Sequence, residues 1–192
     1  MPVSVYDTSV VHVQIINKPN HRKDTVKTVV VSEKTFEEKC SSVQKVYTSQ
    51  IGVTELTGHN DGVQVEKYLA SVGLPKGFAY CAAGCHWSFM TAGVKTTINA
   101  AAASTFNKNN LVYLNRVKLK NPIAGADVIQ FWIPSLNGIH HCGFWDKEHG
   151  NGMYESVEFN TSVGSGIFQE GGGVGRKIRS YNATYAISRW IK

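Results

Sequence analysis

One cysteine of this sequence lies where thiol chemistry is favoured. Cys81 follows a loop that contains Gly77 and begins an Ala-rich stretch that we expect to be helical as far as Gly93. The unpaired N–H groups and the dipole at a helix N-terminus stabilise a thiolate, and they can also stabilise an oxyanion. Cys81 is therefore a candidate nucleophile, with the alternative that it is simply a small buried hydrophobe.

Two neighbouring histidines offer the base that such a nucleophile needs. His140 and His141 begin a predicted strand, and adjacent strand residues face opposite sides, so we expect one of the two to line a cleft. An imidazole there can take the thiol proton and later give it to a leaving amine. Glu158 and Asn160 stand two apart in the next predicted strand, on one face, where either could hold the imidazole through its other nitrogen.

The same residue types allow a second interpretation, a zinc site. Soft ligands fall into two clusters, Cys81-Cys85-His86 and His140-His141-Cys142. Neither cluster has the short Cys-x-x-Cys spacing of common zinc modules, and neighbouring helical residues face different ways. We therefore expect no metal and no cofactor, and keep a zinc-binding protein as an alternative function.

Composition limits the class of protein. The chain has 192 residues, of which 42% are hydrophobic and 18% charged, as in a single globular domain with a short extension. The sequence contains no run of eighteen apolar residues, so it offers no candidate for a membrane-spanning helix. The net charge of +6 includes basic residues at 116, 118 and 120 and at 176, 177 and 179, which we expect on a solvated surface. No nucleic-acid motif accompanies them, so we expect neither a nucleic-acid nor a membrane partner.

Periodicity predicts helices first and strands afterwards. Residues 1–31 read as extended, and helical patterns cover 32–47, 62–73, 81–93 and 96–106. Strands are predicted at Asp127–Ile133, Cys142–Asp146, Met153–Phe159, Lys177–Tyr181 and Tyr185–Trp190. This order is typical of an α+β fold. We expect residues 1–50 to be an extension or small accessory unit, and residues 51–192 to be the catalytic domain.

The order of these motifs resembles the CHAP family of cysteine, histidine-dependent amidohydrolases/peptidases. Tyr80-Cys81-Ala82-Ala83 is similar to the aromatic-Cys-Ala-Ala segment of that family, and Pro122–Ile129 to its Pro-x-x-Gly-Asp strand with one residue inserted. His140-His141-Cys142-Gly143 resembles its Gly-His-x-Gly motif, and Glu158-Phe159-Asn160-Thr161 its Glu-Gly-Asn-Thr-like segment. The resemblance covers roughly residues 55–181.

The resemblance implies a papain-like fold, with N-terminal helices packed on an antiparallel half-barrel, and cleavage of an amide bond in peptidoglycan by an amidase or endopeptidase. Cys81 would be the nucleophile and His141 the base. Glu158 would orient the imidazole, and Asn160 would assist or be the third member itself. We expect substrate contacts from Tyr80, Trp87 and Trp132.

The implied biology follows from the same resemblance. The partner would be the peptidoglycan peptide, the protein would be a monomer, and a delivery or immunity protein could accompany it. The start of the chain lacks the basic and apolar regions of a secretory signal. We therefore expect synthesis in the cytoplasm and action on the cell wall after phage lysis, as for an endolysin, or after specialised secretion.

Two departures from the family pattern bear on the cleft. Gly84-Cys85-His86 replaces an apolar stretch, and Phe159 replaces a small residue, so we expect a narrowed or reshaped substrate groove. The acidic loop that binds calcium in some relatives is not visible. A non-catalytic wall-binding or inhibitory module on the same fold remains the alternative to an enzyme.

Overall fold

The computed structural model describes residues 33–162 and 172–192, and residues 36–192 form one compact unit. The strands expected within residues 1–31 lie outside the described residues. The division of the chain at residue 50 stays a prediction. Residues 36–48 form a helix whose apolar side chains belong to the main hydrophobic core.

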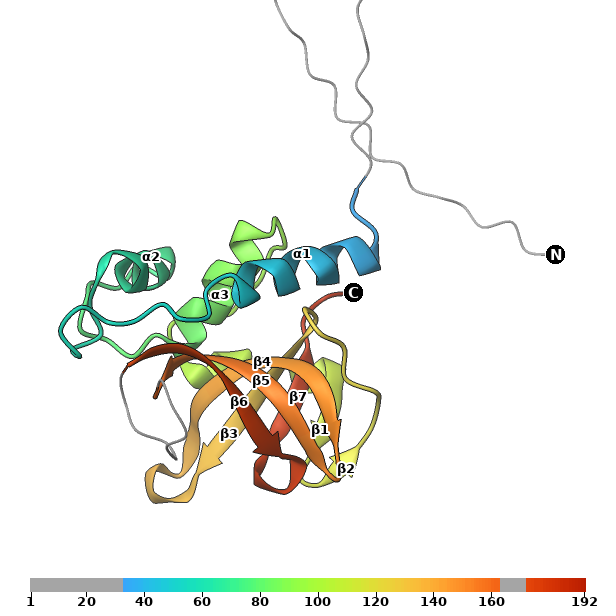
Figure 1. Ribbon diagram of the computed structural model, residues 1–192. Helices are drawn as coiled ribbons and strands as arrows, with labels where there is room; N and C mark the ends of the chain where they lie inside the picture. The colour runs from blue at the N-terminus through green and yellow to red at the C-terminus, as the bar shows by residue number, and fades with distance from the viewer. Residues whose placement is uncertain (1–32, 163–171) are drawn as a thin grey trace, which may run out of the picture. The chain divides into compact units, whose positions relative to one another are not determined.

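Three helices gather on one side of a curved sheet (Figure 1). They are α1 (Phe36–Thr48), α2 (Val63–Ser71) and α3 (Cys81–Thr91), and they confirm three of the four helical predictions. In the described part of the chain, no helix is long and apolar enough to cross a membrane.

The predicted helix over residues 96–106 is wrong. The segment contains only the 3-10 turn η1 (Ala102–Thr105). The Oδ1 atom of Asn99 accepts a hydrogen bond from the N–H of Ala101 at 2.9 Å, a local turn that competes with helix formation. The carbonyl oxygen of Ile98 instead lies 2.7 Å from Nδ1 of His86 in α3, so a tertiary contact fixes this segment.

Within the described residues, seven antiparallel strands form one sheet in the order β2-β1-β7-β3-β4-β5-β6. Their bounds are β1 (Leu111–Leu114), β2 (Val117–Lys118), β3 (Asp127–Ile133), β4 (Gly138–Gly150), β5 (Met153–Thr161), β6 (Gly173–Ser180) and β7 (Ala186–Arg189). The five predicted strands are present, and β1 and β2 were missed. Three further 3-10 turns are η2 (Lys108–Asn110), η3 (Pro134–Leu136) and η4 (Tyr181–Ala183). The predicted α+β class, helices packed on an antiparallel sheet, is confirmed.

Both faces of the sheet are apolar, because successive side chains of a strand point to opposite sides. On β3, Val128 belongs to the core beneath the helices. Its neighbour Ile129 belongs to a second core on the other face, together with Phe131. The sheet therefore has two buried faces along its centre, as expected of a half-barrel.

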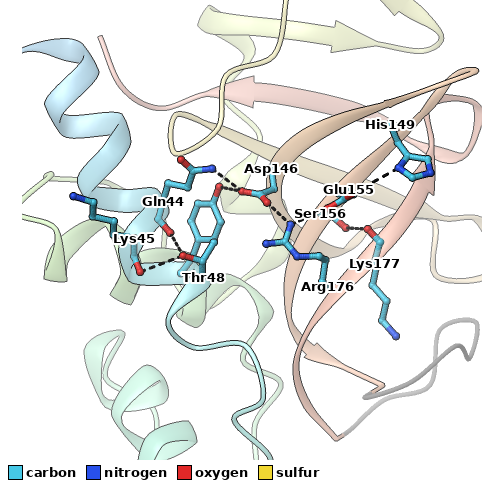
Figure 2. Close-up of polar contacts among 10 residues, drawn as sticks. Gln44, Lys45, Thr48, Asp146, His149, Glu155, Ser156, Arg176 and Lys177 are labelled. Atoms are coloured by element: carbon cyan, nitrogen blue, oxygen red, sulfur yellow. Dashed lines mark hydrogen bonds and ion pairs between the residues drawn. The ribbon is translucent and has the colours of Figure 1, made fainter.

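A buried carboxylate ties α1 to the sheet (Figure 2). Asp146 on β4 accepts hydrogen bonds from Nε2 of Gln44 at 3.0 Å and from the hydroxyl of Tyr47 at 2.6 Å. Arg176 on β6 forms an ion pair with the same carboxylate and with Glu155, where Nη1 and Oε2 are 3.0 Å apart. Because these contacts span α1, β4 and β6, they anchor the first helix to the sheet.

Candidate active site

Cys81 occupies the first position of α3, with only 4% of its surface exposed. The residue before it, Tyr80, makes no side-chain capping hydrogen bond to the helix. The first-turn N–H groups of α3 are therefore not satisfied by a capping side chain, and they remain available to an anion. This arrangement suits both a thiolate and the oxyanion formed when a thiolate attacks a carbonyl.

His141 on β4 brings an imidazole to the thiol. The thiol of Cys81 and the imidazole of His141 lie close enough for each to shift the pKa of the other. The imidazole ring also stacks on the ring of Phe131 on β3, with ring centroids 5.6 Å apart. His140 points elsewhere: it is exposed, and its Nε2 lies 3.3 Å from the carbonyl oxygen of Leu136. The structure thus brings one histidine of the pair to Cys81.

Glu158 on β5 holds the other nitrogen of this imidazole. Its Oε2 lies 2.8 Å from Nε2 of His141, and the carboxylate is fully buried. Ser156 donates a hydrogen bond to Oε1 at 2.6 Å. Arg179 on β6 binds both oxygens, from Nε at 2.7 Å and from Nη2 at 2.5 Å. These contacts fix the position of the carboxylate, and hence the orientation of the imidazole.

Sequence reasoning missed Arg179 as a functional residue. It was counted only among the basic residues expected on a solvated surface, whereas its side chain is 13% exposed and pairs with Glu158. A buried carboxylate requires a compensating cation. The position of Glu158 in the middle of a core strand was therefore the signal in the sequence that a buried arginine or lysine lies nearby. The sequence did not identify Arg179 as the partner of Glu158, because the two residues meet only through the pairing of β5 with β6 and not through a fixed spacing along the chain.

Charge and burial set the protonation of the three central groups. Burial opposes the charged form of Glu158, but the hydrogen bonds from Arg179 and His141 hold its pKa well below the usual range. Burial also lowers the pKa of His141, yet the hydrogen bonds with Cys81 and Glu158 outweigh it and raise that pKa to about 10. The neighbouring Cys142 thiol and burial raise the pKa of Cys81 well above its usual value, while His141 lowers it. The titration of Cys81 is therefore coupled to that of His141.

Two glycines allow the close approaches on which the site depends. A Cβ on Gly143 would lie 2.6 Å from Cγ of Glu158, so a side chain there would displace the carboxylate. A Cβ on Gly84 would lie 2.2 Å from the ring of Phe159. The Gly84 and Phe159 departures from the family pattern therefore compensate each other, since the large ring fills the space that the glycine leaves.

Asn160 lies at a break in the regular pairing of β5 with β6. Its backbone has a φ of 53°, and the register between β5 and β6 shifts between Phe159 and Thr161. Asparagine adopts this left-handed conformation more readily than most residues. The Asn160 backbone lies close enough to the hydroxyl of Tyr80 to lower the pKa of that hydroxyl. Within residues 33–162 and 172–192, Oδ1 of Asn160 is buried without a hydrogen-bond partner.

The three residues expected to contact substrate lie in different surroundings. Tyr80 has no exposed surface, and its hydroxyl lies 3.1 Å from Oε1 of Glu55, so its position is that of a core residue. Trp87 is half-buried and packs edge-on against Tyr68 with centroids 5.2 Å apart. Trp132 is 41% exposed and lines a surface pocket. Trp132 is thus the most accessible of the three.

The zinc interpretation finds no ligand set in the described part of the chain. There, no group of three or more histidine, cysteine or acidic side chains is arranged to hold a metal ion. The cysteines Cys40, Cys81, Cys85 and Cys142 are all free thiols.

No family model and no curated protein match this chain. Similar solved structures include the peptidoglycan hydrolase RipB from Mycobacterium tuberculosis, 18% identical with a TM-score of 0.48 over 82% of this chain and 67% of that chain. A mutated form of the resuscitation promoting factor interacting protein RipA is 18% identical, with a TM-score of 0.48 over 85% of this chain and 69% of that chain. At these values the neighbours carry no argument about activity, and membership of the CHAP family stays a hypothesis.

Proposed function

We propose that this chain is a cysteine hydrolase that cleaves an amide bond in the peptide part of peptidoglycan. One observation supports the chemistry above all others: Nε2 of His141 lies 2.8 Å from a buried carboxylate, and the same imidazole lies close enough to Cys81, at the uncapped start of α3, to lower the pKa of its thiol. A nucleophile, a base and a group that orients the base are the parts that acyl transfer requires.

The proposed reaction has two stages. The Cys81 thiolate attacks the amide carbonyl, and the imidazolium of His141 gives its proton to the departing amine, leaving a thioester on Cys81. His141 then takes a proton from water, and the resulting hydroxide attacks the thioester to release a carboxylic acid and regenerate the Cys81 thiolate beside the protonated His141. Glu158 keeps Nε2 of the imidazole occupied throughout, so the other ring nitrogen faces the sulfur.

Backbone and side-chain groups at the start of α3 complete the site. The N–H of Cys81 stabilises the oxyanion of each tetrahedral intermediate. Asn160, two residues after Glu158 on β5, assists the site through its side chain.

The substrate class rests on the resemblance of the four sequence motifs to the CHAP family, whose members cut peptidoglycan. Both family departures are accommodated, because the ring of Phe159 packs where Gly84 leaves room. The motifs are consistent with either an amidase or an endopeptidase.

The test is a digest of purified peptidoglycan from several wall chemotypes, with products identified by mass spectrometry. We expect wild type to release fragments with new amine and carboxyl termini, and Cys81→Ala to release none. Cys40→Ala is the matched control, because it removes another buried thiol from α1. It should release the wild-type fragments.

Two results would contradict the proposal. Equal release by Cys81→Ala and wild type would exclude the thiol mechanism. Release of nothing by the folded wild type, from every chemotype, would favour the non-catalytic wall-binding module or an enzyme acting on a different amide.

A further inference from the structure

Glu55 joins three separate segments of the chain beside the candidate nucleophile. Its Oε1 accepts hydrogen bonds from the hydroxyl of Tyr80 and from the N–H of Gly172, each at 3.1 Å. Its Oε2 accepts a hydrogen bond from the N–H of Asn60 at 3.0 Å. These donors lie 5, 25 and 117 positions away in the sequence. One partly buried carboxylate therefore holds together segments that the sequence keeps apart.

The backbone beside this carboxylate is fixed to the edge of the sheet. The N–H of Glu55 donates to the carbonyl oxygen of Gly172 at 3.1 Å, so the two residues are hydrogen-bonded in both directions. The preceding residue, Thr54, forms an antiparallel bridge with Gly173, the first residue of β6. Glu55 is therefore supported by the sheet and can act as a fixed point for the side chain that it binds.

Tyr80 is held by this fixed point at the start of α3. Its carbonyl oxygen accepts the first hydrogen bond of the helix, from the N–H of Gly84 at 2.8 Å, and Cys81 follows it directly. Its ring has no exposed surface and stacks on Tyr68, with centroids 6.0 Å apart. A buried tyrosine hydroxyl needs a hydrogen-bond partner, and Glu55 supplies the acceptor. The position at which α3 begins is thus set by packing of the ring and by the bond to Glu55.

The Tyr80 ring also connects the start of α3 with β5. Tyr68, on which it stacks, packs edge-on against Phe159 with centroids 5.1 Å apart. The Asn160 backbone lies close to the Tyr80 hydroxyl, and Asn160 comes two residues after Glu158 on the same strand. Tyr80 therefore lies between the helix that carries the thiol and the strand that carries the orienting carboxylate. Movement of Tyr80 would change the position of the thiol relative to His141.

We propose that Glu55 is a positioning residue, which holds Cys81 against His141 by fixing the hydroxyl of Tyr80. The inference rests on the proposed function, because it concerns the nucleophile and base of that reaction. A displacement of about 1 Å can lower the rate of an enzyme by about 100-fold. Loss of Glu55 should therefore slow the chemical step and leave the affinity for substrate unchanged.

The first test measures hydrolysis of a soluble muropeptide by full-length wild type and variants. Glu55→Ala removes all acceptor atoms of the side chain, Glu55→Gln keeps one acceptor oxygen, and Tyr80→Phe removes only the hydroxyl. We expect kcat to fall by about 10–100-fold in Glu55→Ala and by less in Glu55→Gln, with KM within about twofold of wild type. Tyr80→Phe should also lower kcat. Adding Glu55→Ala to Tyr80→Phe should cost less than in wild type, because both changes break the same hydrogen bond.

Glu66→Ala is the matched control. Glu66 lies on α2, and its Oε1 also accepts a hydrogen bond from a backbone N–H, that of Gly62 at 3.3 Å. This variant should keep the wild-type kcat and KM. Urea unfolding measures the loss of stability in each variant separately. A destabilised Glu55→Ala with wild-type kcat in its folded fraction would overturn the proposal, as would a change in KM alone or an equal loss of kcat in Glu66→Ala.

A second test needs no substrate and therefore separates this proposal from the proposed function. His141 and Cys142 shift the pKa of Cys81 in opposite directions, so the pH midpoint for alkylation of Cys81 by iodoacetamide depends on where the thiol lies. We expect this midpoint to move by about half a pH unit or more in Glu55→Ala and Tyr80→Phe, and not in Glu66→Ala. Moved midpoints, with no hydrolysis by wild type, would support the positioning role and contradict the proposed hydrolysis. Hydrolysis by wild type, with unmoved midpoints and unchanged kcat in both variants, would do the reverse.

Discussion

Replacing Glu158 by Gln removes the charge beside His141 and keeps the size of the side chain. The variant leaves Arg179 without its carboxylate and weakens the contact that now joins Oε2 to Nε2 at 2.8 Å. Breaking a buried ion pair by neutralising one partner costs about 3–5 kcal/mol of folding stability. A total stability of about 5–15 kcal/mol is usual for a domain, so we expect a weakened but folded protein.

The same change alters the acidity of the Cys81–His141 pair. The pKa of His141 is raised from 6.5 to about 10, mainly by its hydrogen bonds with Cys81 and Glu158. A tenfold change in a protonation constant equals about 1.4 kcal/mol, so this rise corresponds to about 5 kcal/mol. Because the hydrogen bond and the charge of Glu158 both raise the pKa of His141, Glu158→Gln should lower it.

The direction in which the reactivity of Cys81 changes with pH follows from the loss of a proton by the Cys81–His141 pair. A raised pKa means that the Cys81–His141 pair loses its first proton only as the pH approaches about 10, so the reactive form grows with pH up to that value. In Glu158→Gln the increase of the reactive form with pH should occur at lower pH than in wild type. Its plateau is also lower, by about 10²–10⁴-fold in turnover, because the imidazole is no longer oriented and the imidazolium is less stabilised.

The assay measures alkylation of Cys81 by iodoacetamide from pH 6 to 10.5, read by peptide mass mapping, alongside the rate of wall digestion. Asp127→Asn is the matched control, because Asp127 is also a fully buried carboxylate bound to an arginine. Arg189 is 15% exposed and Arg179 is 13% exposed, so the two ion pairs are similarly buried. Both variants should lose stability in urea, and Asp127→Asn should keep the wild-type pH profile.

Two outcomes would refute this reasoning. An unchanged or higher midpoint in Glu158→Gln would show that the carboxylate does not raise the pKa of His141. A similar displacement in Asp127→Asn would show that lost stability, and not the missing charge, alters the profile.

Three further predictions concern the surroundings of the site. Cys142→Ala removes a thiol that raises the pKa of Cys81, so alkylation of Cys81 at pH 8 should be faster than in wild type, and an unchanged rate would contradict this cause. Gly84→Ala places a Cβ 2.2 Å from the ring of Phe159 and should cost about 1–3 kcal/mol in urea unfolding. Adding Phe159→Leu should recover part of that loss, and no recovery would place the strain elsewhere. The pKa of Glu158 is lowered from 4.5, so its contribution to stability is present above that pH and is lost as the pH falls below it. Urea titrations at pH 7 and pH 4 should show this loss in wild type and less of it in Glu158→Gln.

The sequence predicted the parts of the site that depend on local pattern. The Ala-rich stretch after Cys81 and the closing glycine indicated a helix that begins there, and α3 begins at that residue. Alternation in two successive strands indicated that one of the two histidines could meet Glu158 or Asn160, and His141 meets Glu158. These inferences succeed because helix starts and strand faces are set by neighbouring residues.

The parts that were missed depend on partners far apart in the chain. Arg179 lies 21 positions after Glu158 and meets it only through the pairing of β5 with β6. The matching of Gly84 with Phe159 likewise joins a helix to a strand. The strand β2 was overlooked because its two residues are too few to show alternation, and β1, its four-residue hairpin partner, was overlooked with it.

The central claim is that Cys81 carries the acyl group during hydrolysis of a peptidoglycan amide. The most direct measurement is mass spectrometry of an acid-quenched reaction between the protein and a soluble muropeptide, followed by peptide mapping. We predict an added acyl fragment on the peptide that contains Cys81, and neither adduct nor product with Cys81→Ala. An acyl group on Cys40, Cys85 or Cys142, or hydrolysis by Cys81→Ala at the wild-type rate, would contradict the account.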